Sequence, residues 1–214
     1  MSRFLIKQND IREFLGDLRS RYGAGGRLFL VGETSQVLEG WRTWTDAIDF
    51  CAEVDDRAAF DRETALAAQR LDLTLCEENP EDVIPLPDGY RERARQVDGS
   101  SALEILHFDP YSTSFRYLAR GDECDYHLVL AYIAHGWIDV DEMDRLLQDL
   151  MPKFSMDTIQ QDPAEFRRRY KGLMQMEKFT PLRYVSRPPG SCQGPGSRFT
   201  ASVAGFACSC QGAL

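Results

Sequence analysis

The sequence predicts an α+β fold made of two successive parts, and three observations support this. In the first half of the chain, short apolar or alternating runs are interspersed with amphipathic stretches at helical spacing. The second half shows only helical patterns joined by short connectors, as in a small bundle. From residue 177 onward, Pro, Gly and Ser are frequent, which is typical of a disordered tail. We expect an α+β domain of about four strands at 1–109, a helical portion at 110–176 and a tail at 177–214.

The first helix and the first strand are separated by a run of glycines. Apolar side chains recur at helical spacing over residues 10–22, where Asp10 is the expected N-cap. The glycine run ends this helix, and residues 27–31 are apolar enough for a buried strand. Gly32 then breaks the strand, and residues 34–40 fit a short helix.

Three more strands and one helix follow from alternation and capping. The strand at 47–54 ends at a pair of aspartates that precede a helical run at 57–71. Residues 72–76 alternate apolar and polar side chains, as a half-buried strand does. Residues 83–87 contain two prolines and therefore cannot form a central strand. Residues 90–97 fit either a short helix or an extended chain, and residues 102–108 alternate again as a fourth strand.

Helices are expected throughout the second part, because apolar side chains recur there at helical spacing between short polar connectors. Such helices pack against their sequence neighbours. Their expected ranges are 110–120, 123–135, 140–151 and 163–176.

Composition limits the classes of function. The net charge of −9 argues against broad, nonspecific binding to nucleic acid. No apolar run reaches the roughly 20 residues of a membrane span, and the apolar stretch at the N-terminus is too short for a signal peptide. The six cysteines include no C-x-x-C pair. We therefore expect a cytoplasmic protein that does not bind a membrane.

The turn at Gly32 is the first candidate site. A strand that breaks at a glycine into a helix leaves free backbone N–H groups at the helix start, and these groups suit a phosphate together with the helix dipole. Thr34 and Ser35 follow the turn and add hydroxyl groups. One hypothesis is that Gly32, Thr34 and Ser35 hold a triphosphate. The alternative is an ordinary connection between a strand and a helix.

Asp46 and Asp49 form the second candidate site. Two carboxylates on one face of a strand can bind the same Mg²⁺, and the spacing that places them so is i, i+2. The i, i+2 partner of Asp49 is Ala47, whereas Asp46 lies on the opposite face unless a bulge shifts the register. The alternative is that Asp46 caps the strand and Asp49 is a polar edge residue.

Charged residues on two further elements extend the candidate site. Asp72 begins the third expected strand and can supply another carboxylate, with Glu77 at the strand end as the alternative. Arg116 and Arg120 lie four residues apart on one helical face and can reach phosphates between the two parts. Arg120 can equally form a structural ion pair with Asp125.

The stretch from Leu30 to Ser35, together with the stretch from Thr45 to Phe50, resembles the polymerase-β type nucleotidyltransferase superfamily. Within it, the chain is similar to bacterial and archaeal nucleotidyltransferase-like proteins of unassigned function, related to abortive-infection toxins and minimal nucleotidyltransferase antitoxins. The resemblance covers roughly residues 10–150 and implies a mixed sheet with flanking helices. Three further stretches carry it: Asn79 to Pro85, Leu103 to Tyr111 and Leu118 to Asp125.

The resemblance also implies roles for particular residues. It places Gly32 and Ser35 beside the phosphates of a nucleotide and Asp49 at the second of two positions that bind Mg²⁺. The first of these positions falls on Ala47, whose methyl group cannot bind a cation. Glu33 replaces the second small residue of the turn, and its charge would repel a phosphate if it pointed inward.

Two hypotheses of function follow from this resemblance. In the first, a nucleotidyltransferase-like protein uses Mg²⁺ to transfer a nucleoside monophosphate from a nucleoside triphosphate to a protein or RNA acceptor. Asp49 would then bind the metal, and Asp72 would assist. In the second, a catalytically degenerate member binds a nucleotide or a partner protein without chemistry, for example in a toxin–antitoxin pair. Ala47 favours the second hypothesis, and the surrounding pattern favours the first.

Overall fold

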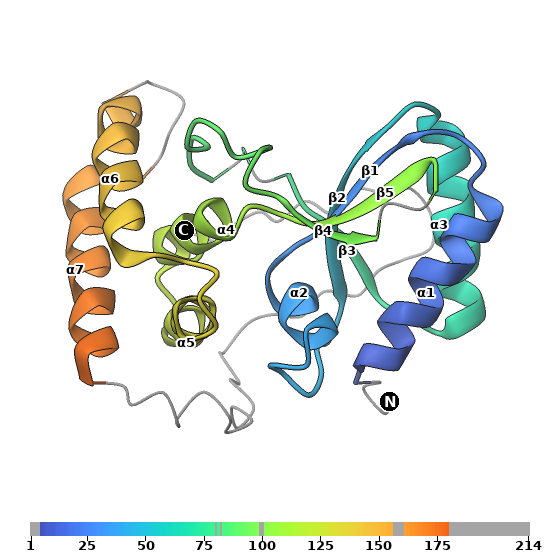
Figure 1. The fold of residues 1–214 in the computed structure, drawn as a ribbon, viewed down its shortest axis with the longest axis horizontal. Coiled ribbons are helices and arrows are strands. Elements are labelled where there is room, and N and C mark those ends of the chain that lie inside the picture. Colours follow the sequence, from blue (N-terminus) through green and yellow to red (C-terminus); the bar gives the residue numbers. More distant parts are fainter. Residues whose placement is uncertain (1–4, 80, 82, 99–100, 156–160, 180–214) are drawn as a thin grey trace.

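The computed structural model describes residues 5–79, 81, 83–98, 101–155 and 161–179, which form an α+β fold around one mixed, open, five-stranded sheet (Figure 1). The strands are β1 Gly26–Leu30, β2 Ile48–Val54, β3 Leu75–Glu77, β4 Arg95–Asp98 and β5 Leu103–His107. The helices are α1 Gln8–Arg21, α2 Gly32–Leu38, α3 Arg57–Leu71, α4 Pro110–Arg120, α5 Glu123–Ala134, α6 Val140–Leu150 and α7 Pro163–Phe179, and a 3-10 helix spans Met151–Ser155. The predicted α+β class is confirmed.

The sheet has the strand order β3-β2-β1-β5-β4. β1 runs antiparallel to β2 and parallel to β5, β2 runs parallel to β3, and β4 runs antiparallel to β5. The predicted count of four strands is wrong, because β4 adds a fifth at one edge. Its sequence is mostly polar, so apolar alternation did not identify it, although the extended alternative for residues 90–97 agrees with it.

The third strand begins later than predicted. Asp72 is the C-cap of α3 in a left-handed conformation (φ 53°, ψ 46°), and its N–H donates to the carbonyl of Ala68. The chain becomes a strand only at Leu75. The prediction that Asp72 lies in a strand is therefore wrong, because the last turn of α3 extends over it. Asp10 is likewise not the N-cap of α1: it lies inside the helix, where its carboxylate accepts the N–H of the N-cap residue, Lys7.

The core is divided among three groups of buried side chains. One lies between the sheet and the helices α1 and α3, which pack together on one side of the molecule (Figure 1). A second fills the helical portion from α4 to α7, on the other side of the view. A third, small group on the sheet contains Phe29, Val31 and Phe108. The junction between the sheet and the helical portion therefore lies along α4, which follows β5 directly.

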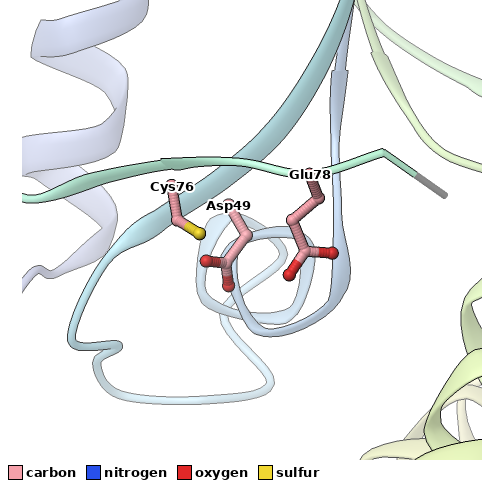
Figure 2. Close-up of side chains that lie close together, drawn as sticks. All are labelled: Asp49, Cys76 and Glu78. Atoms are coloured by element: carbon pink, nitrogen blue, oxygen red, sulfur yellow. The ribbon is translucent and has the colours of Figure 1, made fainter. Parts of the chain in front are cut away.

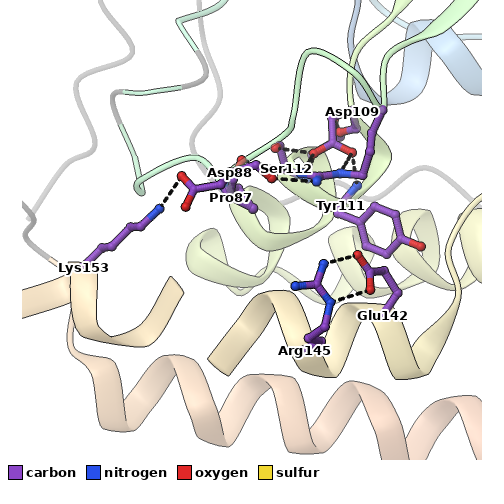
Figure 3. Close-up of polar contacts among 10 residues, drawn as sticks. Pro87, Asp88, Asp109, Tyr111, Ser112, Glu142, Arg145 and Lys153 are labelled. Atoms are coloured by element: carbon purple, nitrogen blue, oxygen red, sulfur yellow. Dashed lines mark hydrogen bonds and ion pairs between the residues drawn. The ribbon is translucent and has the colours of Figure 1, made fainter. Parts of the chain in front are cut away.

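A buried ion pair between Arg93 and Asp109 holds the loop before β4 against the start of α4. Figure 3 shows Asp109 beside Tyr111 and Ser112 at that helix start. Asp109 has no exposed surface, and its two carboxylate oxygens accept from Arg93 at 3.1 and 2.8 Å. The same carboxylate caps α4 by accepting the N–H groups of Tyr111 and Ser112. Because a buried carboxylate needs such partners, Asp109 fixes both the loop and the helix start.

The last predicted helix extends a little beyond its expected end, since α7 continues to Phe179 rather than to residue 176. The rest of the predicted tail, residues 180–214, lies outside the described residues. In the described part of the chain, we find no helix with the length and apolar character that a membrane crossing requires.

Candidate functional site

The Gly32 turn has the strand–glycine–helix geometry that the sequence predicts. Gly32 adopts φ +56°, in the left-handed region that favours glycine. A Cβ built there would lie 1.7 Å from the hydroxyl oxygen of Tyr117 on α4. The Tyr132 hydroxyl donates to the Gly32 carbonyl at 3.3 Å. The turn is therefore packed directly against α4 and α5, and no larger residue fits there.

The hydroxyl groups of Thr34 and Ser35 are committed to the fold. Both residues are almost fully buried in the first turns of α2. Ser35 donates to the carbonyl of Leu30, and Thr34 donates to the carbonyl of Ala47 while accepting the N–H of Asp49. These bonds attach α2 to β1 and to the start of β2. The Thr34 hydroxyl therefore positions the backbone of Asp49, and the Ser35 hydroxyl holds α2 against β1. These roles differ from the direct phosphate contact that the sequence suggested.

Three side chains from β2 and the β3 segment converge on one point (Figure 2). Ligand atoms of Asp49, Cys76 and Glu78 lie within 4.8 Å of one another. Asp49 and Cys76 are paired residues of the parallel strands, so their side chains leave the sheet on the same face. Glu78 lies two residues beyond Cys76 and shares that face, and its N–H donates to the carbonyl of Phe50 at 2.7 Å.

The carboxylate beside Asp49 is therefore Glu78, which the sequence analysis missed. Asp72 is exposed at the end of α3 and is not part of the cluster. Glu77, the alternative, forms an ion pair with Arg57 on α3. Glu78 can be recognised because it lies two residues after Cys76, the residue that pairs with Asp49. Reading that spacing requires the β2–β3 register, and the single sequence did not provide it.

Asp46 does not join this cluster. Asp46 and Ala47 lie in a bend before β2, and the β1–β2 pairing runs without a shift from Leu30↔Phe50 to Gly26↔Val54. No bulge in the described part of β2 therefore brings Asp46 to the face of Asp49. Removal from water raises the pKa of Glu33, and the negative charge of Asp46 raises it further. The prediction that Asp46 and Asp49 together hold one cation is not supported by this geometry.

The environment of Asp49 favours the protonated form of its carboxyl group. Removal from water raises the pKa of Asp49 well above its ordinary value, and the negative charges of Glu78 and Glu33 raise it further. The guanidinium groups of Arg120 and Arg116 act in the opposite direction. A carboxylate that is crowded by like charge and away from water is one that a bound cation would stabilise.

The two predicted arginines both act on the site, and each is already paired. Arg116, largely buried on α4, contacts Glu78 at 2.5 Å, and its Nε has no hydrogen-bond partner among the described residues. Arg120 contacts Asp125 at 2.8 Å and lies over the Tyr117 ring. The structural alternative for Arg120 is thus confirmed. Glu33 is held by Arg42 at 3.3 Å and by the Thr45 hydroxyl.

The donor set of the cluster fits a divalent cation. Mg²⁺ is commonly held by one or two carboxylates, with waters and substrate phosphates completing its shell, and Asp49 and Glu78 provide such a pair. The thiol of Cys76 is a softer ligand that suits Zn²⁺ better than Mg²⁺. Comparison of this chain with protein-family models, with curated proteins and with solved structures finds no match. The chemistry of the site is therefore argued from its geometry.

Proposed function

We propose that this chain is a nucleotidyltransferase-like protein that binds a nucleoside triphosphate and a divalent cation at Asp49 and Glu78. The observation that carries the proposal is the convergence of two carboxylates beside Cys76: Asp49 on β2, the strand that follows the Gly32 turn and α2, and Glu78 just after β3. This order of strand, glycine turn, helix and acidic strand agrees with the resemblance of residues 30–35 and 45–50 to the polymerase-β type superfamily. Arg116 and Arg120 add positive charge within electrostatic range of Asp49.

The reaction proposed is transfer of a nucleoside monophosphate to a protein or RNA acceptor. A hydroxyl oxygen of the acceptor forms a bond to the α-phosphorus, the bond from that phosphorus to pyrophosphate breaks, and pyrophosphate leaves. A Mg²⁺ ion, when bound, would neutralise charge on the phosphates. Asp49 and Glu78 would hold that ion. Glu78 would take the assisting role that the sequence assigned to Asp72, as the second carboxylate on the ion, and the hydroxyl proton would pass to solvent water.

A second candidate function is binding without transfer, and two observations favour it. The position two residues before Asp49 is Ala47, so the proposed cation site lacks one carboxylate that the resemblance leads us to expect. Arg116 also occupies one oxygen of Glu78, which makes that oxygen less available to a cation. In this form the protein binds a nucleotide or a partner protein, for example as one member of a toxin–antitoxin pair.

One experiment separates the two candidates. The protein is incubated with each of the four labelled nucleoside triphosphates and Mg²⁺, and both bound and transferred label are measured. Transfer that disappears in Asp49→Asn and persists in Glu77→Gln supports the enzyme, because Glu77 faces away from the cluster and pairs with Arg57. Cation-dependent binding without transfer supports the second candidate. If neither binding nor transfer is observed, both are contradicted.

A further inference from the structure

The outer edge of β2 is only half covered by its neighbour. β3 pairs with Ile48, Asp49 and Phe50, whereas β2 continues to Val54. Backbone groups of the even-numbered residues face this edge, since the Ile48 N–H donates to the Thr74 carbonyl and the Phe50 carbonyl accepts from Glu78. By the same alternation, the N–H and C=O groups of Ala52 and Val54 point to the open edge. Within the described ranges, no strand pairs with them.

A groove lies along this open edge. Its cavity has a volume of about 460 Å³ and is lined from β2, from the start of α3, from the end of β3 and from the loop that contains Leu86 and Tyr90. Among the described residues, five aromatic rings line it: Phe29, Phe50, Phe60 and Phe108, which are almost fully buried, and the half-buried Tyr90. An apolar surface beside unpaired backbone groups is the arrangement to which an extended peptide adds as a further strand.

The rim of the groove is acidic. Among the residues that the structure describes, five carboxylates line it, namely Glu53, Asp61, Glu77, Glu78 and Glu81, against one guanidinium, that of Arg91. Arg91 pairs with Glu53, Arg57 with both Asp61 and Glu77, and Arg116 with Glu78. Even with these three arginines counted, the carboxylates outnumber the cations. The groove therefore favours a positively charged occupant.

We propose that this groove binds an extended, cationic peptide segment of a partner protein, which adds to β2 as a strand. The peptide backbone would pair with Ala52 and Val54. Alternate side chains would contact the aromatic floor, and the intervening Lys or Arg residues would face the acidic rim. A second copy of this chain is a poorer occupant, because two acidic rims would be brought together. The proposal does not depend on nucleotide or cation binding.

The test measures binding of a labelled decapeptide of alternating Lys and Val to the full chain, without nucleotide or divalent cation. We expect saturable binding that falls at least tenfold in Glu53→Lys and in Asp61→Lys. These side chains are about two-fifths exposed, so reversal of their charge is compatible with folding. The matched control is Glu104→Lys on β5, which is similarly exposed and does not line the groove. It should bind as the wild type does.

Hydrogen exchange identifies the mode of binding. With peptide at ten times its dissociation constant, we expect the amides of Ala52 and Val54 to exchange about tenfold more slowly. A decapeptide of alternating Glu and Val should give neither binding nor protection. The proposal is overturned if the Lys peptide does not bind, if Glu104→Lys weakens binding as much as Glu53→Lys, or if the two amides are not protected. It is also overturned if the chain self-associates through this edge.

Discussion

Asp49 is a carboxylate whose contribution to folding depends on pH. Its pKa is raised in the folded chain, first by removal from water and then by the charges of Glu78 and Glu33. The folded chain therefore holds this proton more tightly than the unfolded chain does. The free energy of unfolding accordingly falls as pH rises from the ordinary aspartate range, about 3.9, through the raised pKa.

Replacement of Asp49 by Asn removes the ionisable group and therefore this fall in the free energy of unfolding. At pH 7 we expect Asp49→Asn to raise the free energy of unfolding by more than the roughly 0.5 kcal/mol of an ordinary surface substitution. The difference from the wild type should vanish at a pH below the ordinary aspartate pKa, where both chains are neutral at this position. Urea unfolding across this pH range measures it. A variant that is less stable than the wild type at pH 7 would contradict this account of Asp49.

Gly32 is restricted by both its backbone and its neighbour. We expect Gly32→Ala to lower the free energy of unfolding by about 2 kcal/mol or more, because it combines a positive φ with overlap against the Tyr117 hydroxyl. The matched control is Gly16→Ala in α1, where a Cβ meets no atom within 4 Å. It should stabilise the chain by up to about 1 kcal/mol. Thermal or urea unfolding of both variants is the measurement, and equal effects would contradict the role assigned to the turn.

At this scale, the sequence alone located Asp49 and Gly32 but not Glu78. A glycine between an apolar strand and a helix leaves a recognisable pattern, and a carboxylate on the next strand stands out among apolar neighbours. Glu78 is one of two adjacent glutamates, and only the pairing of Asp49 with Cys76 shows which of them faces the site. That pairing is set by the tertiary structure and cannot be read from a single sequence.

At the scale of the elements, the Asp109 carboxylate joins β5, α4 and the loop before β4. We expect Asp109→Ala to cost about 3–5 kcal/mol of unfolding free energy, because it removes the carboxylate partner of Arg93 and the cap of α4. Asp139→Ala is the control: Asp139 caps α6 through the N–H of Glu142 at an exposed position and should cost only about 1 kcal/mol. Similar losses for the two variants in urea unfolding would contradict the role given to the Arg93–Asp109 pair.

Strand and helix types were more predictable than their boundaries. The amphipathic runs gave α3, α4 and α6 nearly as observed, since their apolar periods are long. β4 is mostly polar, so apolar alternation does not distinguish a strand from a helix there. The start of β3 shifted because Asp72 adopts a left-handed cap, a conformation that short polar side chains tolerate and that alternation does not reveal.

At the scale of the whole molecule, the site lies where the sheet meets the helical portion. Arg116 on α4 and Glu78 after β3 form a contact between the two parts, and both side chains are largely buried. We expect Arg116→Met to lower stability, by about 3 kcal/mol, because Glu78 is then left without its partner. The double variant Arg116→Met with Glu78→Gln should recover most of this loss. A coupling energy below about 0.5 kcal/mol in the double-mutant cycle would show that the pair does not join the two parts.

We propose that Asp49 and Glu78 together hold a divalent cation. The direct test is a titration of the protein with Mn²⁺, in which electron paramagnetic resonance measures the free ion. We predict one site in the wild type that is lost in Asp49→Asn and in Glu78→Gln and is unchanged in Glu77→Gln. Absence of such a site in the wild type, or equal binding in Glu77→Gln and Glu78→Gln, would contradict it.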